Sequence, residues 1–248
     1  MGSAIALGLA PHGYTLTVTN RSIPPLDALK AASPLIATAT DNEKAVTGAH
    51  IVIVAVRPAQ TAAVLDRIGP HIAPGALVVT LSPAQTLADT AAALPAGINV
   101  ARLMPNTAVA VGASMSFIAF ADSVPDLLRR QFVTAIGHLG NVAVIPEPQF
   151  GAVTALCSCG IAYALRYLHA ACQGAVQAGI PAADAARYAA ATMKGAAALL
   201  LASPGKHPEA LIDAVTTPGG TTIRGLNAME AAGFTGAVIQ GILASSHE

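Results

Sequence analysis

Short apolar runs alternate with amphipathic stretches through the first 147 residues of the chain. Continuous runs such as Ile51–Val56 and Ala76–Leu81 are typical of strands buried on both faces of a parallel sheet. The segments between them have the apolar spacing of helices. The predicted strands are 15–19, 51–56, 76–81, 99–103, 116–120 and 141–145, and the predicted helices are 24–32, 62–68, 87–94 and 125–138. This alternation predicts a doubly wound α/β domain with a parallel sheet over residues 1–147.

The pattern changes after Pro146 and Pro148. From residue 150 onward there is no strand pattern, and Ala-rich helices are predicted over 151–178, 182–202, 208–215, 221–232 and 235–245. Gly or Pro residues mark each break between these helices. The sequence therefore predicts a second domain, residues 148–248, that is all helical.

The first predicted helix of this second domain has no charged side chain on any face between Gly151 and Ala164. A helix that is apolar all round is normally buried. Roughly a hundred residues are too few to surround it, so we expect a second copy of the chain to cover it; the alternative is that the α/β domain does so. Charged residues make up only 10 % of the chain, against about 25 % in typical soluble domains, which also favours a homodimer or a higher oligomer.

Other classes of protein are less consistent with the composition. The formal net charge is zero, so no nucleic-acid or membrane-surface partner is expected. The uncharged run Leu103–Ala121 is long enough to span a membrane, but Pro105 and several polar residues within it argue against a spanning helix. No secretory signal is found, which predicts a cytoplasmic protein. Cys157, Cys159 and Cys172 are expected to be small buried free thiols, and no metal site is predicted from the spacing of the histidines and cysteines.

A glycine pair between two predicted helices is the most informative segment, Thr216-Thr217-Pro218-Gly219-Gly220-Thr221-Thr222-Ile223. Pro218 is expected to end one helix, and Thr221 and Thr222 to cap the next. A Gly-rich helix start offers free backbone N–H groups and a positive dipole end, which suit a carboxylate. An ordinary inter-helix loop is the alternative for this segment taken alone.

Three further segments follow predicted strands, where ligands bind in sheets of this kind. They are Met104-Pro105-Asn106-Thr107, Ala55-Val56-Arg57-Pro58 and Thr19-Asn20-Arg21-Ser22. Asn106 is able to hold a carboxamide, although Pro-Asn is also common in turns. Arg21 stands where an arginine selects the 2′-phosphate of NADP over the free ribose of NAD, unless it is simply a solvated arginine.

Together these segments, in this order and spacing, resemble the pyrroline-5-carboxylate reductases. The resemblance extends over nearly the whole chain and is strongest in Met104–Thr107, Val153–Tyr163 and Asp213–Ile223. It implies a doubly wound (Rossmann-like) domain that binds NADPH, with NADH as an alternative, and an all-α dimerisation and substrate domain. The implied reaction is the reduction of 1-pyrroline-5-carboxylate to L-proline, the last step of proline biosynthesis.

The resemblance also implies a role for individual residues. The cofactor-binding residues would be Gly2, Ser3, Asn20, Arg21, Ser22, Asn42, Ala55, Val56, Pro58 and Asn106. Among these, Asn20–Ser22 would hold the adenosine 2′-phosphate, Asn42 would meet the ribose, and Asn106 would lie close to the nicotinamide. Thr217, Gly220 and Thr221 would bind the substrate carboxylate, and the hydroxyl of Thr222 would interact with the imine nitrogen during catalysis.

The sequence departs from the family at three places. Met1–Ile5 matches only the end of the usual Gly-x-Gly-x-Met-Gly motif, with Gly2 as its third glycine. The usual first strand is lacking, so we expect two strand edges to remain unpaired and the natural start to lie further upstream. Cys157-Ser158-Cys159-Gly160 stands where most members have Ser-Gly-Ser-Gly, and Ser82-Pro83-Ala84-Gln85 stands where small residues ending in Gly are common.

Two alternatives to this reductase are open. A non-catalytic dimerisation protein that has lost its cofactor would explain the incomplete phosphate-binding loop. A related imine or hydroxy-acid reductase would share the two-domain plan, but the hydroxy-acid enzymes need a lysine deep in the first helix of the second domain. The sequence has no lysine between Gly151 and Met193.

Overall fold

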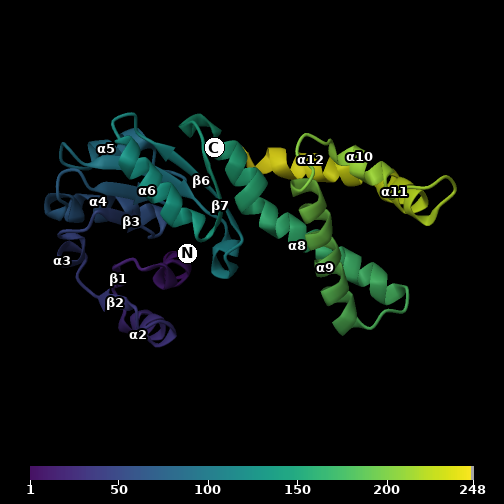
Figure 1. The fold of residues 1–248 in the computed structure, drawn as a ribbon, viewed down its shortest axis with the longest axis horizontal. Coiled ribbons are helices and arrows are strands. Elements are labelled where there is room, and N and C mark those ends of the chain that lie inside the picture. The colour runs from purple at the N-terminus through teal and green to yellow at the C-terminus, as the bar shows by residue number, and fades with distance from the viewer. Residues whose placement is uncertain (247–248) are drawn as a thin grey trace. The chain divides into compact units, whose positions relative to one another are not determined.

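The computed structural model describes residues 1–246. Contacts between Cα atoms divide the chain into two compact units, one formed by Met1–Ser158 and the other beginning at Cys159. Figure 1 shows the first unit as a sheet with flanking helices and the second as helices only. Each unit is described separately below.

The first unit contains two sheets. Strands β1 (Leu16–Thr19) and β2 (Ile36–Ala39) pair in parallel with each other. The larger sheet has the order β3-β4-β5-β6-β7, formed by Ile51–Val54, Leu77–Thr80, Asn99–Met104, Ser114–Phe120 and Gly140–Val144. Neighbouring strands in it are parallel except β5 and β6, which are antiparallel. The expected parallel α/β sheet is therefore present, with one antiparallel pairing.

The gap between the two sheets falls between β1 and β3. Within residues 1–246, β1 pairs only with β2 and β3 pairs only with β4. The facing edges of Leu16–Thr19 and Ile51–Val54 thus have no strand partner, as the sequence predicted. Unpaired backbone groups at such edges are able to accept a further strand.

Alternation along β4 places helices on both faces of the larger sheet. Leu77 and Val79 pack on one face, in the cluster that includes residues of α1 (Gly2–Leu9) and α6 (Asp126–Gly137). Val78 packs on the opposite face, against residues of α3 (Asn42–Val46) and α4 (Thr61–Ile68). Successive side chains of a strand point to opposite faces, so an all-apolar strand requires both layers. Helices α2 (Ile23–Ala32), α5 (Leu87–Ala92) and α7 (Phe150–Val153) complete the unit.

Most predicted elements of this unit are found within a few residues of their expected ends. The sequence interpretation missed α1, and it missed β2 and α3, which are only four and five residues long. Ile36-Ala37-Thr38-Ala39 has one large apolar side chain, so its strand character comes from pairing with β1 rather than from its own pattern.

The second unit consists of helices α8 (Gly160–Gln177), α9 (Ala182–Leu201), α10 (Pro208–Asp213), α11 (Thr221–Ala231) and α12 (Phe234–Ser245). The predicted helix over 151–178 is divided: α7 leads into a π-helical turn, η6 (Thr154–Cys159), and then into α8. The hydroxyl of Tyr163 in α8 donates to the carbonyl oxygen of Gly241 and forms a 2.5 Å hydrogen bond with Ser245 Oγ, which ties α8 to α12. Within residues 159–246 only Ala185 is fully buried.

Candidate cofactor and substrate sites

The predicted adenosine-binding residues lie together at the ends of β1 and β2. Asn20 follows β1, and its backbone N–H donates to the carbonyl oxygen of Ala39 at the end of β2 (3.3 Å). The side-chain oxygen of Asn20 accepts a hydrogen bond from the backbone N–H of Ser22 (3.0 Å), which shapes the turn between them. Arg21 is exposed within this turn. Its guanidinium is therefore accessible to a phosphate group.

Asn42 lies at the same edge because β1 and β2 are parallel and end side by side. It is the first residue of α3, and Asp41 caps this helix by accepting from the backbone N–H of Lys44 (3.1 Å). That hydrogen bond, more than the nearby ammonium of Lys44, lowers the pKa of Asp41. The capped helix holds Asn42 in a defined place next to the Asn20–Ser22 turn.

The start of α1 lies against the end of β3. A Cβ atom added to Gly2 would meet the Cβ of Ala55 at 3.1 Å, closer than most real contacts. No side chain caps α1 at Met1, so the first amides of this helix remain available to an anion. Ala55, Val56 and Pro58 are exposed after β3. Gly2 and Ser3 are thus brought to the same strand end as the predicted nicotinamide-side residues, and the close approach fits a dinucleotide phosphate there.

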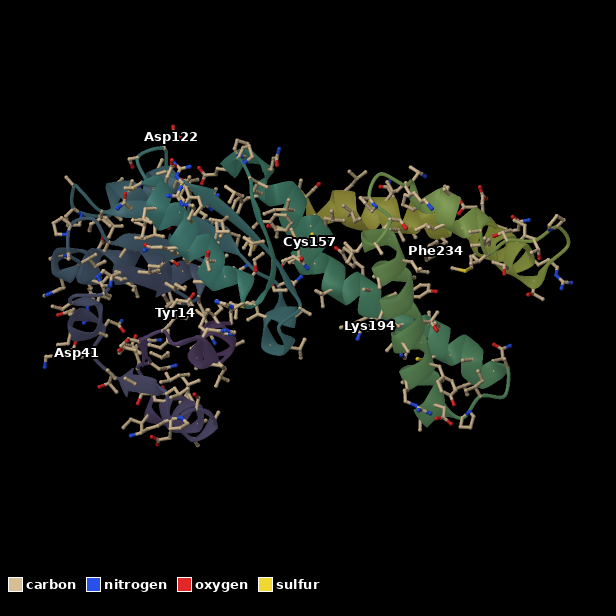
Figure 2. All side chains as sticks on the ribbon, in the orientation of Figure 1. Tyr14, Asp41, Asp122, Cys157, Lys194 and Phe234 are labelled. Carbon is tan, nitrogen blue, oxygen red and sulfur yellow. The ribbon has the colours of Figure 1, made fainter. Side chains whose placement is uncertain are left out.

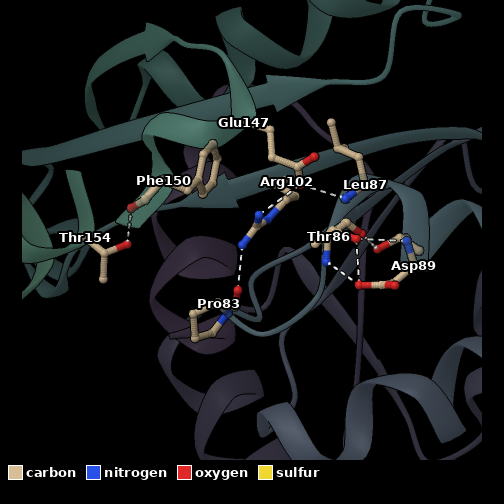
Figure 3. A network of polar contacts seen from close by, with 9 residues as sticks. Pro83, Thr86, Leu87, Asp89, Arg102, Glu147, Phe150 and Thr154 are labelled. Carbon is tan, nitrogen blue, oxygen red and sulfur yellow. Dashed lines mark hydrogen bonds and ion pairs between the residues drawn. The ribbon is translucent and has the colours of Figure 1, made fainter. Parts of the chain in front are cut away.

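A buried polar network fixes the loop after β4, and the sequence interpretation did not foresee it (Figure 3). Arg102 of β5, only 5 % exposed, donates to Glu147 Oε1 (2.9 Å) and to the carbonyl oxygen of Pro83 (2.7 Å). Glu147 Oε1 also accepts from the backbone N–H of Leu87 at the start of α5 (2.7 Å). The guanidinium carbon lies 4.6 Å from the centre of the Phe150 ring. The sequence carried one signal of this network, an arginine within a largely apolar strand, because a buried arginine needs polar partners.

The hydroxyl of Ser82 lies next to this network. Ser82 is buried in the loop after β4, and its Oγ has no hydrogen-bond partner among the described residues. A buried hydroxyl normally has a partner. Its position beyond the carboxyl end of β4 is where this class of sheet receives a ligand, so the Ser82–Ala84 loop joins the residues that line the candidate cofactor site.

Asn106 is buried beyond the end of β5. Its side-chain oxygen accepts from the backbone N–H of Ala108 (3.1 Å), and its Nδ2 donates to the carbonyl oxygen of Cys157 (3.2 Å). One amide hydrogen of Asn106 is left for another acceptor. The Asn106 side chain therefore already makes two hydrogen bonds inside the protein, and any contact with the nicotinamide would be made in addition to them.

The predicted carboxylate-binding residues lie in the second unit, between α10 and α11. The backbone N–H of Gly220 donates to the carbonyl oxygen of Thr217 (2.9 Å), and Gly219 has a φ of 71°. A Cβ on Gly220 would collide with the Thr217 hydroxyl, so only glycine fits this turn. Thr217, Thr221 and Thr222 are exposed.

Two details of this turn differ from the sequence interpretation. Helix α10 ends at Asp213, several residues before Pro218, because the Thr216 hydroxyl donates to the carbonyl oxygen of Ile212 and Thr216 N–H to that of Asp213. Gly220, not a threonine, is the N-cap of α11, and it has no side chain to cap the helix. The expected threonine cap is therefore wrong, and the first amides of α11 are free to bind an anion.

The three cysteines are free thiols, as expected, but each is only partly buried rather than fully buried. Burial raises the pKa of the Cys157 thiol, so Cys157 is a poorer nucleophile than an exposed cysteine. Within residues 1–246 no group of three or more His, Cys, Asp or Glu side chains is placed to hold a metal ion.

The fold and these sites define a class of protein, the oxidoreductases that pair a dinucleotide-binding α/β unit with a helical unit. Comparison with known families supports this class in both parts of the chain. Residues 1–84 match the family profile "NADP oxidoreductase coenzyme F420-dependent", and residues 147–248 match "Pyrroline-5-carboxylate reductase dimerisation".

Individual relatives agree with these profiles. Pyrroline-5-carboxylate reductase 2 of Dictyostelium discoideum is 32 % identical over all of this chain and 88 % of its own length. Pyrroline-5-carboxylate reductase 1 of the same organism is 37 % identical over 99 % of this chain, which spans 47 % of that protein. The solved structure of a pyrroline-5-carboxylate reductase from Coxiella burnetii has a TM-score of 0.89 and 26 % identity, covering 99 % of this chain and 92 % of the other.

The chain belongs to the pyrroline-5-carboxylate reductase family. Membership makes it an NAD(P)H-dependent oxidoreductase, with the reductase step of proline biosynthesis as its function. The fold agrees with this relationship: a Rossmann-like sheet precedes an all-helical unit.

Proposed function

We propose that the chain reduces 1-pyrroline-5-carboxylate to L-proline with NADPH. The observation that carries this proposal is the turn before α11, where Gly220 leaves the first helical amides uncapped beside exposed Thr221 and Thr222. A small carboxylic acid with a neighbouring C=N bond needs an anion site and a hydroxyl in this arrangement. The segment lies within the part of the chain that matches the family's dimerisation profile.

The first unit would hold the dinucleotide along the carboxyl ends of its strands. Arg21, Asn20 and Ser22 would bind the 2′-phosphate, and Asn42 the adenosine ribose. The uncapped amides of Gly2 and Ser3 would face the pyrophosphate. Ala55, Val56, Pro58 and Asn106 would line the nicotinamide end. The exposed arginine favours NADPH, and NADH is the expected weaker alternative.

The second unit would bind and orient the substrate. The free backbone amide of Thr221, next to the bare backbone of Gly220 and the Thr217 hydroxyl, would hold the carboxylate. The Thr222 hydroxyl would donate a hydrogen bond to the ring nitrogen, which makes the C=N carbon a better hydride acceptor. A threonine hydroxyl is a weak acid, so Thr222 polarises and orients the bond rather than acting as a strong acid. NADPH would supply the hydride.

The helical unit would form a homodimer, or a higher oligomer built from it. Large apolar side chains are exposed on all its longer helices, including Leu165, Tyr188, Leu201 and Ile239. The helical segment Glu147–Gln177 is also long and apolar enough, by length and composition alone, to cross a membrane. It falls wholly within the dimerisation profile, so we expect a second subunit to cover it in a cytoplasmic protein without nucleic-acid or membrane partners.

A specific observation motivates the second candidate, a non-catalytic dimerisation protein. The unpaired edges of β1 and β3 flank the place where α1 begins and the pyrophosphate would bind. Family membership favours the reductase over this alternative. Titrating NADPH against the full chain, followed by its fluorescence, separates the two: saturable binding with proline formation supports the reductase. The absence of both NADPH binding and turnover would overturn the reductase proposal.

Two substitutions test the assigned roles. Arg21→Ala should weaken NADPH binding about 10- to 100-fold, as expected for a lost charge-assisted contact, and should weaken NADH binding less. Equal losses of affinity for the two cofactors would remove the 2′-phosphate role of Arg21.

Thr222→Ala should lower turnover by about 10- to 100-fold and leave NADPH binding unchanged. Unaltered turnover would remove Thr222 from the mechanism, while Thr235→Ala, on exposed α12, serves as a control for threonine loss in the same unit.

A further inference from the structure

Asn106 is held by four hydrogen bonds that come from three different segments. Its backbone N–H donates to Ser114 Oγ of β6 (3.3 Å), and its carbonyl oxygen accepts from the N–H of Val109 (3.2 Å). Its side-chain oxygen accepts from Ala108 N–H, and its Nδ2 donates to the Cys157 carbonyl oxygen. With only 5 % of the residue exposed, Asn106 has a fixed position and a fixed orientation of its amide.

The bond to Cys157 reaches the middle of the π-helical turn η6 (Thr154–Cys159). Thr154 donates its hydroxyl to the carbonyl oxygen of Phe150 at the start of this turn (2.7 Å), and Ala155 is fully buried. Cys157 itself packs against the cluster of Met104, Phe117, Ala119 and Phe150. Single π-turns within helices are rare and are frequent at functional sites. Cys157 is labelled in Figure 2.

The position of η6 in the chain gives the bond its significance. The two compact units divide between Ser158 and Cys159, inside η6. The chain therefore passes from the unit with the candidate cofactor site to the unit with the candidate substrate turn through the segment that Asn106 holds. Loss of this bond would leave η6 with one fewer hydrogen bond at the place where the chain leaves the first unit.

We propose that Asn106 is a positioning residue, which fixes the conformation of η6 through the Cys157 carbonyl, and that turnover depends on this conformation. This inference rests on the proposed function, because hydride transfer requires residues from both units. Reacting groups must be held closely, and small displacements far from the chemistry lower turnover strongly. A residue that acted only by contacting the nicotinamide would be expected to affect mainly the affinity for NADPH. A residue that positions η6 should affect turnover more than this affinity.

The sharpest variant is Asn106→Asp. It keeps the oxygen that accepts from Ala108 N–H, but it replaces the Nδ2 donor with an oxygen that faces the Cys157 carbonyl. Asn99→Asp is the matched control, at the start of the strand that precedes Asn106, because the buried Asn99 Nδ2 donates to the carbonyl oxygen of Gly75 (2.8 Å). Both changes remove one donor to one backbone carbonyl. Both should lower the melting temperature by similar amounts, roughly 2–8 °C.

The full chain is compared with the two variants by hydrogen–deuterium exchange, NADPH binding and steady-state kinetics. In Asn106→Asp we expect exchange of the amides of residues 154–160 to be faster by about tenfold, the factor that corresponds to one lost hydrogen bond. Turnover should fall about 10- to 100-fold, while the Kd for NADPH should rise by much less, because Asn106 would meet only the nicotinamide end of the cofactor. In Asn99→Asp exchange should instead rise near Gly75, with η6 and turnover unchanged.

Three results would overturn the proposal. The first is unchanged exchange at 154–160 in Asn106→Asp. The second is an equal loss of turnover in both variants, which would show a purely structural effect, and the third is a Kd for NADPH that rises in step with the loss of turnover. If the unaltered chain lacks reductase activity, the proposed function fails, whereas the exchange experiment still decides whether Asn106 holds η6.

Discussion

The two units of this chain differ in how much of their apolar surface each buries by itself. Strands β4 and β5 of the first unit are buried along their whole length. Helices α8, α10, α11 and α12 of the second contain no buried residue. Burial of apolar surface is the main stabilising term in folding. The first unit therefore has a core of its own, and the second needs a partner to complete one.

The difference also extends to the two candidate sites. The candidate cofactor site of the first unit lies at strand ends that contacts such as Arg102 with Pro83 fix. The candidate substrate turn of the second unit lies at the uncapped helix start after Gly220, on a scaffold that a second subunit is expected to stabilise. Binding of cofactor and formation of the substrate site should thus respond to different substitutions.

The largest effect on assembly and activity should come from a charge on an exposed apolar helix of the second unit. Leu165 in α8 is 59 % exposed, and Leu127 in α6 of the first unit is 61 % exposed. Leu165→Glu should raise the dimer dissociation constant about 100-fold or more, because an unpaired charge at an interface is costly, and activity should fall with it. Leu127→Glu should change neither. Analytical ultracentrifugation measures the difference, and equal dimerisation of both variants would contradict the comparison.

The next effect concerns the buried ion pair of the first unit. Arg102→Met should lower the free energy of unfolding by about 3–5 kcal/mol, since it leaves a partly buried carboxylate without its partner. Glu147→Gln should cost less because its side-chain oxygen still accepts from Arg102 and from Leu87 N–H. Urea unfolding followed by circular dichroism gives both values. A larger loss for Glu147→Gln would show that the negative charge itself matters more than the arginine.

A third pair of substitutions tests whether the two cores are separate. Leu103→Ala removes a fully buried side chain of β5 and should cost about 2–5 kcal/mol, independent of protein concentration. Val238→Ala in α12 should cost about 1 kcal/mol, and this loss should reduce the stability of the dimer. Relative to the unaltered chain, the shift in melting temperature should therefore be the same at every protein concentration for Leu103→Ala and should change with concentration for Val238→Ala. A concentration-independent shift for Val238→Ala would place Val238 outside the interface.

The smallest effect is local and depends on pH. Thr86 caps α5 and donates its hydroxyl to Asp89 (2.6 Å), which with the backbone N–H of Thr86 lowers the pKa of Asp89. A lowered pKa adds stability above the ordinary value of 3.8, and this stability is lost as the pH falls through the lowered pKa. Thr86→Ala should bring the Asp89 pKa back toward 3.8 in an NMR titration. Thr86→Ala should lower the free energy of unfolding less than Leu103→Ala does, and this loss should become smaller as the pH falls. A loss that did not change with pH would show that only the helix cap, and not the Asp89 charge, contributes.

Local patterns in the sequence predicted most of the elements and the candidate site segments. Continuous apolar runs identified β3 and β4, and Gly or Pro residues marked the breaks between helices. The glycine turn at Gly219–Gly220 was also visible, because φ > 0 and close packing demand glycine there. Short elements without a strong apolar pattern, such as β2, were missed because their formation depends on a neighbouring strand.

The sequence by itself thus determined the order of strands and helices, the glycine turn and the scarcity of charge that favours a dimer. Only the tertiary structure decided that Arg102 pairs with Glu147 and that Asn106 donates to the Cys157 carbonyl. These partners are 45 and 51 positions apart, and no periodicity along the chain encodes which residue a buried polar group will meet. Such pairings are set by packing, because a polar side chain enclosed by the fold has to find its partner among the groups that the fold brings within reach.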